Sequence, residues 1–274
     1  MQGFLLYQGE YMGSIKPPLP HAVLTDVIEL ALWAGQLLLQ HGAETSRIEE
    51  TVHHIGTGLG CDWLDIIVLS EGIYITASSG GEFRTKIRRV TRLGVNFDII
   101  DSINDVSRKV FKGKVDRFQL RDALVHIAHH TPHRYNRWSI VVGVGIACAA
   151  FARLFGGDFP AMFVTMIASG SAMYVRQEMT RRYFNNFLVV VTTAAVAGLL
   201  ASFAEILEVS DTPQFAMAAA VLLLVPGVPL INAAEDIVQG NVSTGIARGM
   251  FGGLVTLGIA LGLSIAIRIT GVGL

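Results

Sequence analysis

The stretch that decides the fold is FAMAAAVLLLVPGVPLINAAEDIV, residues 215–238, an apolar run with two prolines in its middle. A helix needs ~20 mostly apolar residues to cross the hydrocarbon core of a bilayer. The second half of the chain holds several such runs and too little polar surface to cover them in a soluble protein. We therefore expect a membrane protein in which residues 136–274 form an α-helical bundle of five transmembrane spans. These spans are predicted at about 138–155, 159–175, 187–204, 215–238 and 245–267.

Composition divides the chain into two parts. Of its 274 residues, 51% are hydrophobic and 16% are charged, against ~25% charged in a typical soluble domain. The segment up to residue 137 carries 15 of the 21 Lys and Arg residues and all 8 His residues. We expect residues 1–20 to be a flexible N-terminal segment and residues 21–135 to form a cytoplasmic domain. The net charge of −1 argues against a nucleic-acid partner, because such proteins carry a basic excess.

The polar part has the pattern of a small α+β domain. Apolar residues recur at helical spacing from Thr25 to Gln40, and Ser46 with Glu49 resembles a capping box at the start of a second helix. Alternating patterns and turn residues predict three strands, followed by two more helices. The strands are expected at 63–70, 73–78 and 82–91, and the helices near 97–110 and 116–130.

Two groups of ionisable residues in this domain leave alternatives open. Arg84, Lys86 and Arg88 alternate along the third strand, which predicts either a solvated face or one that attracts an anionic solute or lipid. Four histidines follow at the end of the last helix, where they resemble metal-ligand spacing or a cationic helix end. No Cys or carboxylate lies among them, so we expect no metal and no cofactor. These histidines are His126, His129, His130 and His133.

Basic residues are unequally distributed between the predicted loops, and this predicts the orientation. Six fall on one side of the membrane, whereas only Arg153 and Arg268 fall on the other. Cytoplasmic loops carry the excess of Lys and Arg. The N-terminus is therefore expected in the cytoplasm and, with five spans, Leu274 on the outside. The six residues are Arg134, Arg137, Arg176, Arg181, Arg182 and Arg248.

The fourth span is broken near mid-bilayer by Pro226, Gly227 and Pro229. Proline lacks an N–H, so Pro226 is expected to leave the carbonyl of Leu222 unpaired, and Pro229 that of Val225. Backbone freed at this depth is tolerated only inside protein or beside a wet cavity, as in the broken helices of transporters. The alternative is a static proline kink.

Polar residues follow the break on one helix face: Asn232, Glu235 and Asp236. Ionisable residues inside a membrane are costly and are functional candidates by default. Asp236 is expected either to pair with Arg176 or to carry a coupling proton. The alternative is that Glu235 and Asp236 already lie in the solvated interface.

Polar residues at the end of the second span are candidates for lining a pathway. Ser169 and Ser171 carry hydroxyls, although hydroxyls in such helices often bond their own i−4 carbonyl. Arg176, followed by Gln177, is the stronger candidate, because an arginine can bind a carboxylate through two parallel hydrogen bonds. Its alternative role is that of a positive-inside anchor.

The segment His41-Gly42-Ala43-Glu44-Thr45 separates the first two predicted helices. Histidine with glutamate can perform acid–base chemistry, but no Ser or Cys nucleophile with a paired base accompanies them. We expect a structural turn or a gate that faces the membrane half.

Three segments together resemble the threonine/serine exporter family. They are Leu38 to Thr45, with its Gly-Ala-Glu-Thr motif, Ala172 to Gln177, and Leu222 to Asn232, with its Pro-Gly-x-Pro-Leu-Ile-Asn motif. The resemblance covers nearly the whole chain from Thr25 and is closest to the YjjP-type subunits of split, two-chain members. In the family motif the acidic residue after Pro-Leu-Ile-Asn corresponds to Asp236, which favours Asp236 over Glu235 as a pathway residue.

The resemblance implies export of a small carboxylate, either succinate or threonine and serine, across a bacterial inner membrane. It implies a small membrane partner subunit that supplies the second module of spans found in the long members, and a homo-oligomer is a further possibility. No Walker-type loop is present, so a secondary exporter is expected rather than an ATP-driven one. Two other classes stay open: a membrane-anchored enzyme acting through His41 and Glu44, and a regulatory subunit that does not transport.

Overall fold

The computed structural model describes residues 17–90, 94–130 and 135–272, and the side chain of His130 is outside this description. The chain forms two compact units. The first comprises the chain up to Thr131 together with Glu235–Gly245, and the second comprises Pro132–Ala234 and Ile246–Leu274. The first unit is therefore discontinuous in sequence: it includes the end of one helix of the membrane half, the turn that follows, and the start of the next helix.

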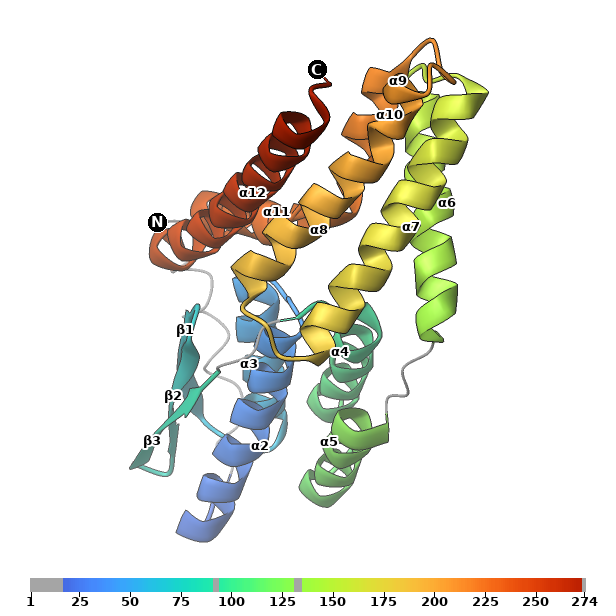
Figure 1. Cartoon of the computed structure of the whole chain (residues 1–274). Coiled ribbons are helices and arrows are strands. Elements are labelled where there is room, and N and C mark those ends of the chain that lie inside the picture. Colours follow the sequence, from blue (N-terminus) through green and yellow to red (C-terminus); the bar gives the residue numbers. More distant parts are fainter. Residues whose placement is uncertain (1–16, 91–93, 131–134, 273–274) are drawn as a thin grey trace. The chain divides into compact units, whose positions relative to one another are not determined.

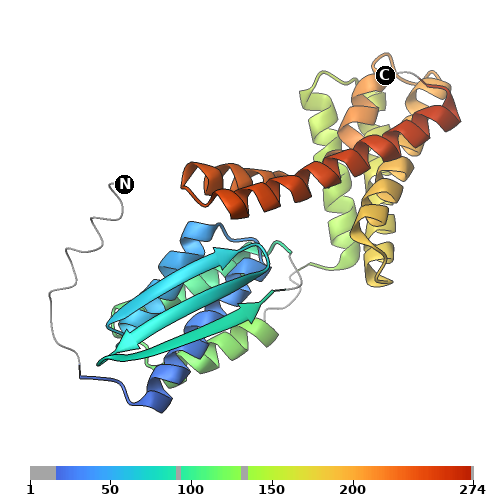
Figure 2. The ribbon, with the colours of Figure 1, turned by 90° about the vertical axis from the view of Figure 1, so that its left-hand side faces the viewer.

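The first unit is an α+β structure with a three-stranded antiparallel sheet of order β1-β2-β3 (Figures 1 and 2). The β2–β3 turn contains Gly80 and Gly81 with φ of +59° and +87°, which suit a two-residue hairpin turn. The elements are α2 (His21–Gln40), α3 (Thr45–Gly58), β1 (Trp63–Leu69), β2 (Gly72–Ser79), β3 (Glu82–Arg89), α4 (Phe97–Phe111) and α5 (Arg117–His130).

The core of this unit lies between one face of the sheet and the helices. Helix α2 packs against β2 and β3, and α3 packs against β1. Ile73 and Ile75 of β2 are fully buried against Leu24, Ile28 and other apolar residues of α2, which is why the α2 sequence is so apolar. Figure 2 shows the opposite face of the sheet turned towards the viewer, with no helix in front of it.

The cations that alternate along β3 are half-exposed, and they also bond to the neighbouring helix. Arg84 hydrogen-bonds to His21, Lys86 forms an ion pair with Glu29, and Arg88 Nη1 donates to Gln36 Oε1 at 3.3 Å. All three partners lie on α2, so the alternating cations join the edge strand to the polar side of the core helix.

The second unit is helical, and α6, α7 and α8 run side by side (Figure 1). Three of its helices are capped at the N-terminus by Asn136, Asp158 and Asn185, whose side chains accept hydrogen bonds from the first turn. The elements are α6 (Arg137–Leu154), α7 (Phe159–Arg181), α8 (Asn186–Ala201), α9 (Phe203–Ile206), α10 (Pro213–Ala220), the 3₁₀-helix η1 (Leu222–Leu224), α11 (Gly227–Val238) and α12 (Val242–Thr270).

Among the described residues, four helical stretches are long and apolar enough to cross a bilayer, and a bent pair makes a possible fifth. The membrane character expected from the sequence is therefore supported, but the candidate membrane-spanning helices are not the same as the five predicted spans. Helix α7 covers the predicted second span yet is not among them, because its polar residues lower its apolarity. Helix α2 is among them, although most of it is buried in the core of the first unit. The stretches are 21–40, 137–154, 186–206 and 242–270, and the bent pair is 213–224 with 227–238.

The predicted break in the fourth apolar run is present: the two halves are bent by 65° between Leu224 and Gly227. The carbonyls expected to be unpaired are not. Leu222 O accepts from Val225 N–H at 3.2 Å, and Val225 O accepts from Gly227 N–H at 2.9 Å. The chain tightens into a 3₁₀ turn before the proline, which satisfies Leu222 O, and a tighter turn across Pro226, from the N–H two residues on, satisfies Val225 O.

Candidate transport site

Arg176 binds the broken helix. Its Nη1 donates to the carbonyl oxygen of Leu223 at 3.0 Å. In a continuous helix that carbonyl would accept from Gly227, but the Gly227 N–H bonds Val225 O, and Pro226 has no N–H to offer. The break therefore does expose a carbonyl, one residue later than the sequence predicts, and the side chain that binds it is the arginine singled out in the second span.

The charge of Arg176 is not neutralised by a neighbouring acid. Among the described residues, no carboxylate lies within 4.0 Å of its guanidinium, and the side chain is half-buried. A cation at such a position is costly unless a counter-charge reaches it. Because a guanidinium has five donors in a planar fork, the single bond to Leu223 leaves most of its hydrogen-bonding capacity for a ligand.

The other lining candidates of α7 are mostly engaged within the protein. Ser169 is fully buried and donates to Thr165 O at 2.6 Å, the i−4 bond that was its alternative role. Gln177 Nε2 donates to Arg137 O at 3.3 Å, while its Oε1 is buried without a hydrogen-bond partner among the described residues. Ser171 is half-buried.

The segment His41–Thr45 is a structural turn that ends α2 and leads into α3. Ala43 N–H donates to Leu38 O at 3.1 Å and Gly42 N–H to Leu39 O at 3.4 Å, with Gly42 at φ +87°, which is a Schellman ending of α2. His41 Nδ1 hydrogen-bonds Leu37 O at 2.6 Å and so closes the same helix. Glu44 precedes α3 in extended conformation and pairs with Arg47 at 2.8 Å.

Asp236 supplies the N-terminal hydrogen bond of α3. Its Oδ1 accepts from Thr45 N–H at 3.1 Å, and both residues are fully buried in the first unit. The capping box expected from Ser46 and Glu49 is wrong: α3 begins at Thr45 with Glu44 at the N-cap position, two residues earlier, and no side-chain cap comes from Glu44. A carboxylate from α11, 191 residues away in sequence, takes that place and is stabilised there by the helix dipole. The segment Leu38–Thr45 and the acidic residue that follows the Pro-Gly-x-Pro-Leu-Ile-Asn motif thus meet through Thr45 and Asp236.

Two further carboxylates differ sharply in environment. Glu49 lies one turn after Thr45 on α3; burial raises its pKa, and the charge of Asp236 raises it further. Glu235 accepts a hydrogen bond from Gln239 at 3.1 Å on the exposed side of α11. From the sequence, Glu49 is predicted only as part of a capping box. The effect of Asp236 on it depends on the tertiary fold.

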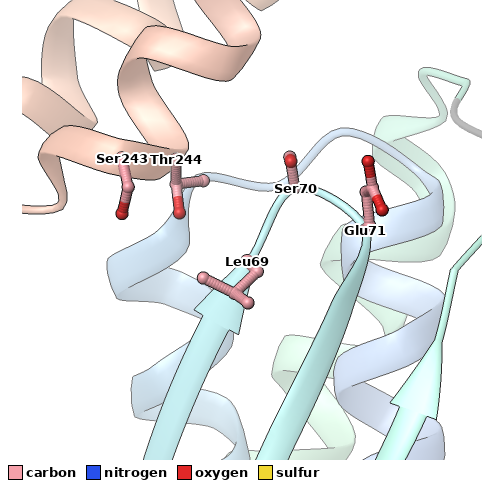
Figure 3. A pocket seen from close by; sticks show the side chains of 5 residues that line it. All are labelled: Leu69, Ser70, Glu71, Ser243 and Thr244. Carbon is pink, nitrogen blue, oxygen red and sulfur yellow. The ribbon is translucent and has the colours of Figure 1, made fainter.

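A second contact joins the same inserted segment to the sheet. Thr244, in the first turn of α12, is buried and donates to Val68 O of β1 at 3.0 Å. Beside it, Ser243 and the β1–β2 turn line an open hollow of about 180 Å³ (Figure 3). This is smaller than the ~300–1,000 Å³ of typical ligand pockets, so the hollow marks the contact rather than a substrate site.

Within the part of the chain that the structure describes, no group of three His, Cys, Asp or Glu side chains is placed to hold a metal ion. Of the histidine cluster, His133 and the side chain of His130 lie outside the described residues.

Comparison with known proteins places the sequence in a family. A family model described as a putative threonine/serine exporter matches residues 29–270. No solved structure matches the chain.

Individual relatives extend over nearly all of the chain. A Klebsiella aerogenes protein named probable succinate transporter subunit YjjP is 35% identical over 246 residues, covering 89% of this chain and 94% of that protein. The protein of the same name from Escherichia coli K12 is 33% identical over 249 residues, with 89% and 95% covered. A probable threonine/serine exporter of Mycobacterium tuberculosis is 23% identical over 244 residues, which is 88% of this chain but 46% of that protein.

The family model spans the sequence from before the first motif to the last apolar helix, and each of the two relatives above 30% identity covers 89% of it. The chain therefore belongs to the threonine/serine exporter family.

Proposed function

We propose that this chain is the domain-bearing subunit of an inner-membrane secondary exporter of small carboxylates, with succinate as the first candidate. It belongs to a family of membrane exporters, and the finer assignment rests on one observation: Arg176 is a half-buried guanidinium with no acidic partner among the described residues. A substrate carboxylate is the counter-charge that this position lacks.

The chemistry of Arg176 suits such a substrate. An arginine fork binds a carboxylate through two parallel charge-assisted hydrogen bonds, roughly twice as strong as neutral ones. The hydrogen bond to Leu223 fixes the guanidinium next to the break, from which α11 begins with its N-terminal, positive end. Broken helices of transporters bind anionic substrate groups in this way.

Transport proceeds by alternating access around the broken span. Residues Pro226, Gly227 and Pro229 form the bend, so the two half-helices can tilt with little loss of hydrogen bonding, and Asn232 lies buried one turn beyond. In this mechanism Arg176 and Gln177 lie on the substrate side of the bend. Ser169 and Ser171 are assigned to the helix surface behind it.

The choice of substrate and of a second subunit draws on the relatives. Two proteins that match this chain along almost their full length are named as probable subunits of a succinate transporter. The mycobacterial exporter is about twice as long as the matched segment, which favours a separate partner chain that supplies its remaining part. Threonine and serine are the second substrate candidates, since they share the carboxylate.

The orientation follows from the residues at one end of α6 and α7. Trp138 stacks on Tyr174 at 5.5 Å, and Arg137 lies over both rings and pairs with Glu178 at 3.5 Å. Trp and Tyr gather at either membrane interface, whereas an excess of basic residues marks the cytoplasmic one. We therefore place the N-terminal domain in the cytoplasm and the C-terminus outside.

The test is export from cells that lack their own carboxylate exporters. Cells preloaded with labelled succinate or labelled threonine would express this chain, a candidate partner chain, or both. Succinate export that requires both chains and is lost in Arg176→Gln, but kept in Arg181→Gln, is the expected result. Arg181 is the matched control, because it lies on the same helix and is exposed.

Other outcomes separate the competing functions. Export by the partner alone would make this chain a regulatory subunit. Export that is indifferent to Arg176→Gln would overturn the proposed site, and turnover of a small metabolite that depends on His41 and Glu44, without export, would favour an enzyme.

A further inference from the structure

We propose that residues 1–16, which precede the described part of the domain, bind back onto the domain and cover the open face of its three-stranded sheet. Both the 1–16 segment and the sheet belong to the first unit, and this binding does not depend on the proposed function. The open face is apolar, and the 1–16 segment has a sequence and a point of attachment that suit it.

The open face of the sheet carries five large apolar side chains, whereas no helix covers it (Figure 2). Successive side chains of a strand point to opposite faces, so Ile73 and Ile75 are fully buried on the helix side while their neighbours point outwards. A contiguous patch of exposed apolar residues marks a binding surface. The five residues and their exposed fractions are Trp63 (41%), Ile67 (55%), Tyr74 (39%), Phe83 (67%) and Ile87 (61%).

The strand register arranges the outward side chains in three rows across the sheet. The two outer rows carry the five large apolar side chains, and the middle row is polar. The outer rows are four residues apart along each strand, which is ~13 Å at the rise of a β-strand. A ligand that fits this face therefore presents apolar groups at the same interval. The rows are Trp63 with Ser78 and Phe83, Asp65 with Thr76 and Thr85, and Ile67 with Tyr74 and Ile87.

The sequence of the 1–16 segment has the matching period. From residue 7 to residue 16, the odd-numbered positions hold only Tyr, Ile or Gly, whereas four of the five even-numbered positions are polar. Such alternation is typical of an extended segment with one buried side. Tyr11 and Ile15 are four residues apart, with Gly13 between them. In an extended chain their side chains are therefore spaced like the two apolar rows.

The described chain begins at one end of the sheet, beside the open face. Leu19 N–H donates to the Oγ of Ser79, the last residue of β2, at 3.0 Å. Pro18 lies against the β2–β3 turn, where a Cβ placed on Gly80 would be 2.2 Å from the Pro18 Cβ. Sixteen extended residues span ~50 Å, whereas a strand of eight residues is ~27 Å long. The 1–16 segment is thus tethered beside the face and is long enough to cross it.

The point of attachment also fixes the order of the contacts. Ile15 is the first large side chain before the attachment point, and it binds the row of Trp63, which adjoins the β2–β3 turn. Tyr11 binds the row of Ile67. Gly13 lies over the polar row, where the lack of a side chain lets the backbone approach the sheet. A tethered segment binds as if it were present at millimolar concentration, which favours it over an occupant from solution.

The charges of the face do not suit a bilayer surface. Among the described outward positions of the three strands, the charged residues are one acid, Asp65, in the middle row and one base, Arg89, at the end of β3. Surfaces that bind anionic lipid carry an excess of Lys and Arg. The face therefore fits an apolar peptide better than a lipid surface.

The first experiment is disulfide cross-linking of the full-length chain in phospholipid vesicles, with copper–phenanthroline as the oxidant. Ile15→Cys is combined with Phe83→Cys, and Tyr11→Cys is combined with Ile67→Cys. We expect a disulfide within one chain in both pairs. Ile15→Cys with Asp101→Cys, an exposed position on α4, is the control and should stay unlinked.

The products distinguish the possible occupants of the face. The two native cysteines, Cys61 and Cys148, are buried, so the introduced pairs dominate the reaction. Cross-links that form only between two chains would assign the face to a second copy and overturn the proposal. Absence of any cross-link in both pairs, or equal cross-linking in the control, would overturn it as well.

The second experiment measures how far the face is covered, through iodide quenching of Trp63 fluorescence. The signal of Trp63 is the difference between each protein and the same protein with Trp63→Phe. Tyr11→Ser combined with Ile15→Ser should release the 1–16 segment and raise the quenching several-fold. Met12→Ser is the matched control and should leave it unchanged, because Met12 is at an even-numbered position.

These substitutions test binding separately from folding, because the described core of the domain is built from residues after the 1–16 segment. Quenching that is high in the unchanged chain, or equal in all variants, would overturn the proposal. Quenching that is low in every variant and rises on transfer from vesicles to detergent would assign the face to the bilayer instead.

Discussion

At the scale of single residues, the most specific prediction concerns Arg176. Arg176→Lys keeps the positive charge but loses the planar fork, so one charge-assisted hydrogen bond to the substrate is lost. Such a bond contributes ~1.5–3 kcal/mol, which corresponds to roughly tenfold to hundredfold weaker substrate binding. The measurement is the concentration dependence of succinate uptake into inside-out vesicles, where KM should rise. An equal rise in Arg181→Lys would show that the effect is not specific to this site.

The raised pKa of Glu49 predicts how its removal changes stability with pH. A carboxyl whose pKa is higher in the folded state stabilises the fold at acidic pH, and that contribution is lost as the pH rises through the folded-state value. The wild type should therefore lose thermal stability relative to Glu49→Gln between acidic and neutral pH. Melting of both proteins in detergent over this range is the check, and parallel curves would contradict it.

At the scale of elements, Asp158 joins two loops of the second unit. Its carboxylate accepts from Ala161 N at 2.7 Å, Ser210 Oγ at 2.8 Å and Asp211 N at 2.8 Å. Burial alone would raise its pKa, but these hydrogen bonds outweigh burial and lower it. Its contribution is then present at neutral pH and is lost as the pH falls through the folded-state value. Asp158→Ala should lower the unfolding free energy by ~0.5–2 kcal/mol at neutral pH, and Asp158→Asn, which can still cap, by less.

Helices α8 and α12 approach closely at glycine. A Cβ placed on Gly262 would lie 2.4 Å from Val191 O and 2.6 Å from Ala194 Cβ, whereas one on Gly253 meets nothing within 4 Å. Small residues allow such contacts between membrane helices. Gly262→Ala should cost ~1–3 kcal/mol by overpacking, and the matched Gly253→Ala should be close to neutral. Thermal melting of the two variants in the same detergent distinguishes them.

Elements of the domain were largely predictable, because their signals are local. Alternation of apolar residues placed the three strands within a residue or two, and Gly42 marked the end of α2. The start of α3 was not predictable in the same way, since the group that binds its first N–H comes from Asp236, far along the chain. The unpaired carbonyl was assigned to Leu222 instead of Leu223, because the 3₁₀ turn before Pro226 shifts the hydrogen bonds.

The candidate site was predictable as a set of residues but not as an arrangement. Arg176 and Asp236 stood out because charge is rare in apolar runs. Their partners, a backbone carbonyl and a backbone N–H, carry no side-chain signal in the sequence. The effect of the Asp236 charge on the pKa of Glu49 could not be predicted, because it depends on the tertiary fold.

At the scale of the whole molecule, the segment 235–245 is held by the domain through backbone as well as side chains. Thr244→Val removes the donor to Val68 O and leaves that carbonyl without this bond. The expected loss is about 1 kcal/mol of unfolding free energy, with the domain as the part affected. Hydrogen exchange should then speed up in β1 and α3. Ser243→Ala, at an exposed neighbouring position, should leave the exchange rates unchanged.

The discontinuity of the first unit has a consequence for biosynthesis. Residues up to Thr131 leave the ribosome long before Glu235–Gly245, and helices α6 to α10, η1 and the first part of α11 are made in between. At ~5–20 residues per second, this interval lasts several seconds or longer. During that time Asp236 has not yet been made, so the Thr45 N–H at the start of α3 lacks this hydrogen-bond acceptor in the nascent domain. Its completion then depends on the broken span, and an arrest of membrane insertion would leave the domain unfinished even though most of its sequence has already been translated.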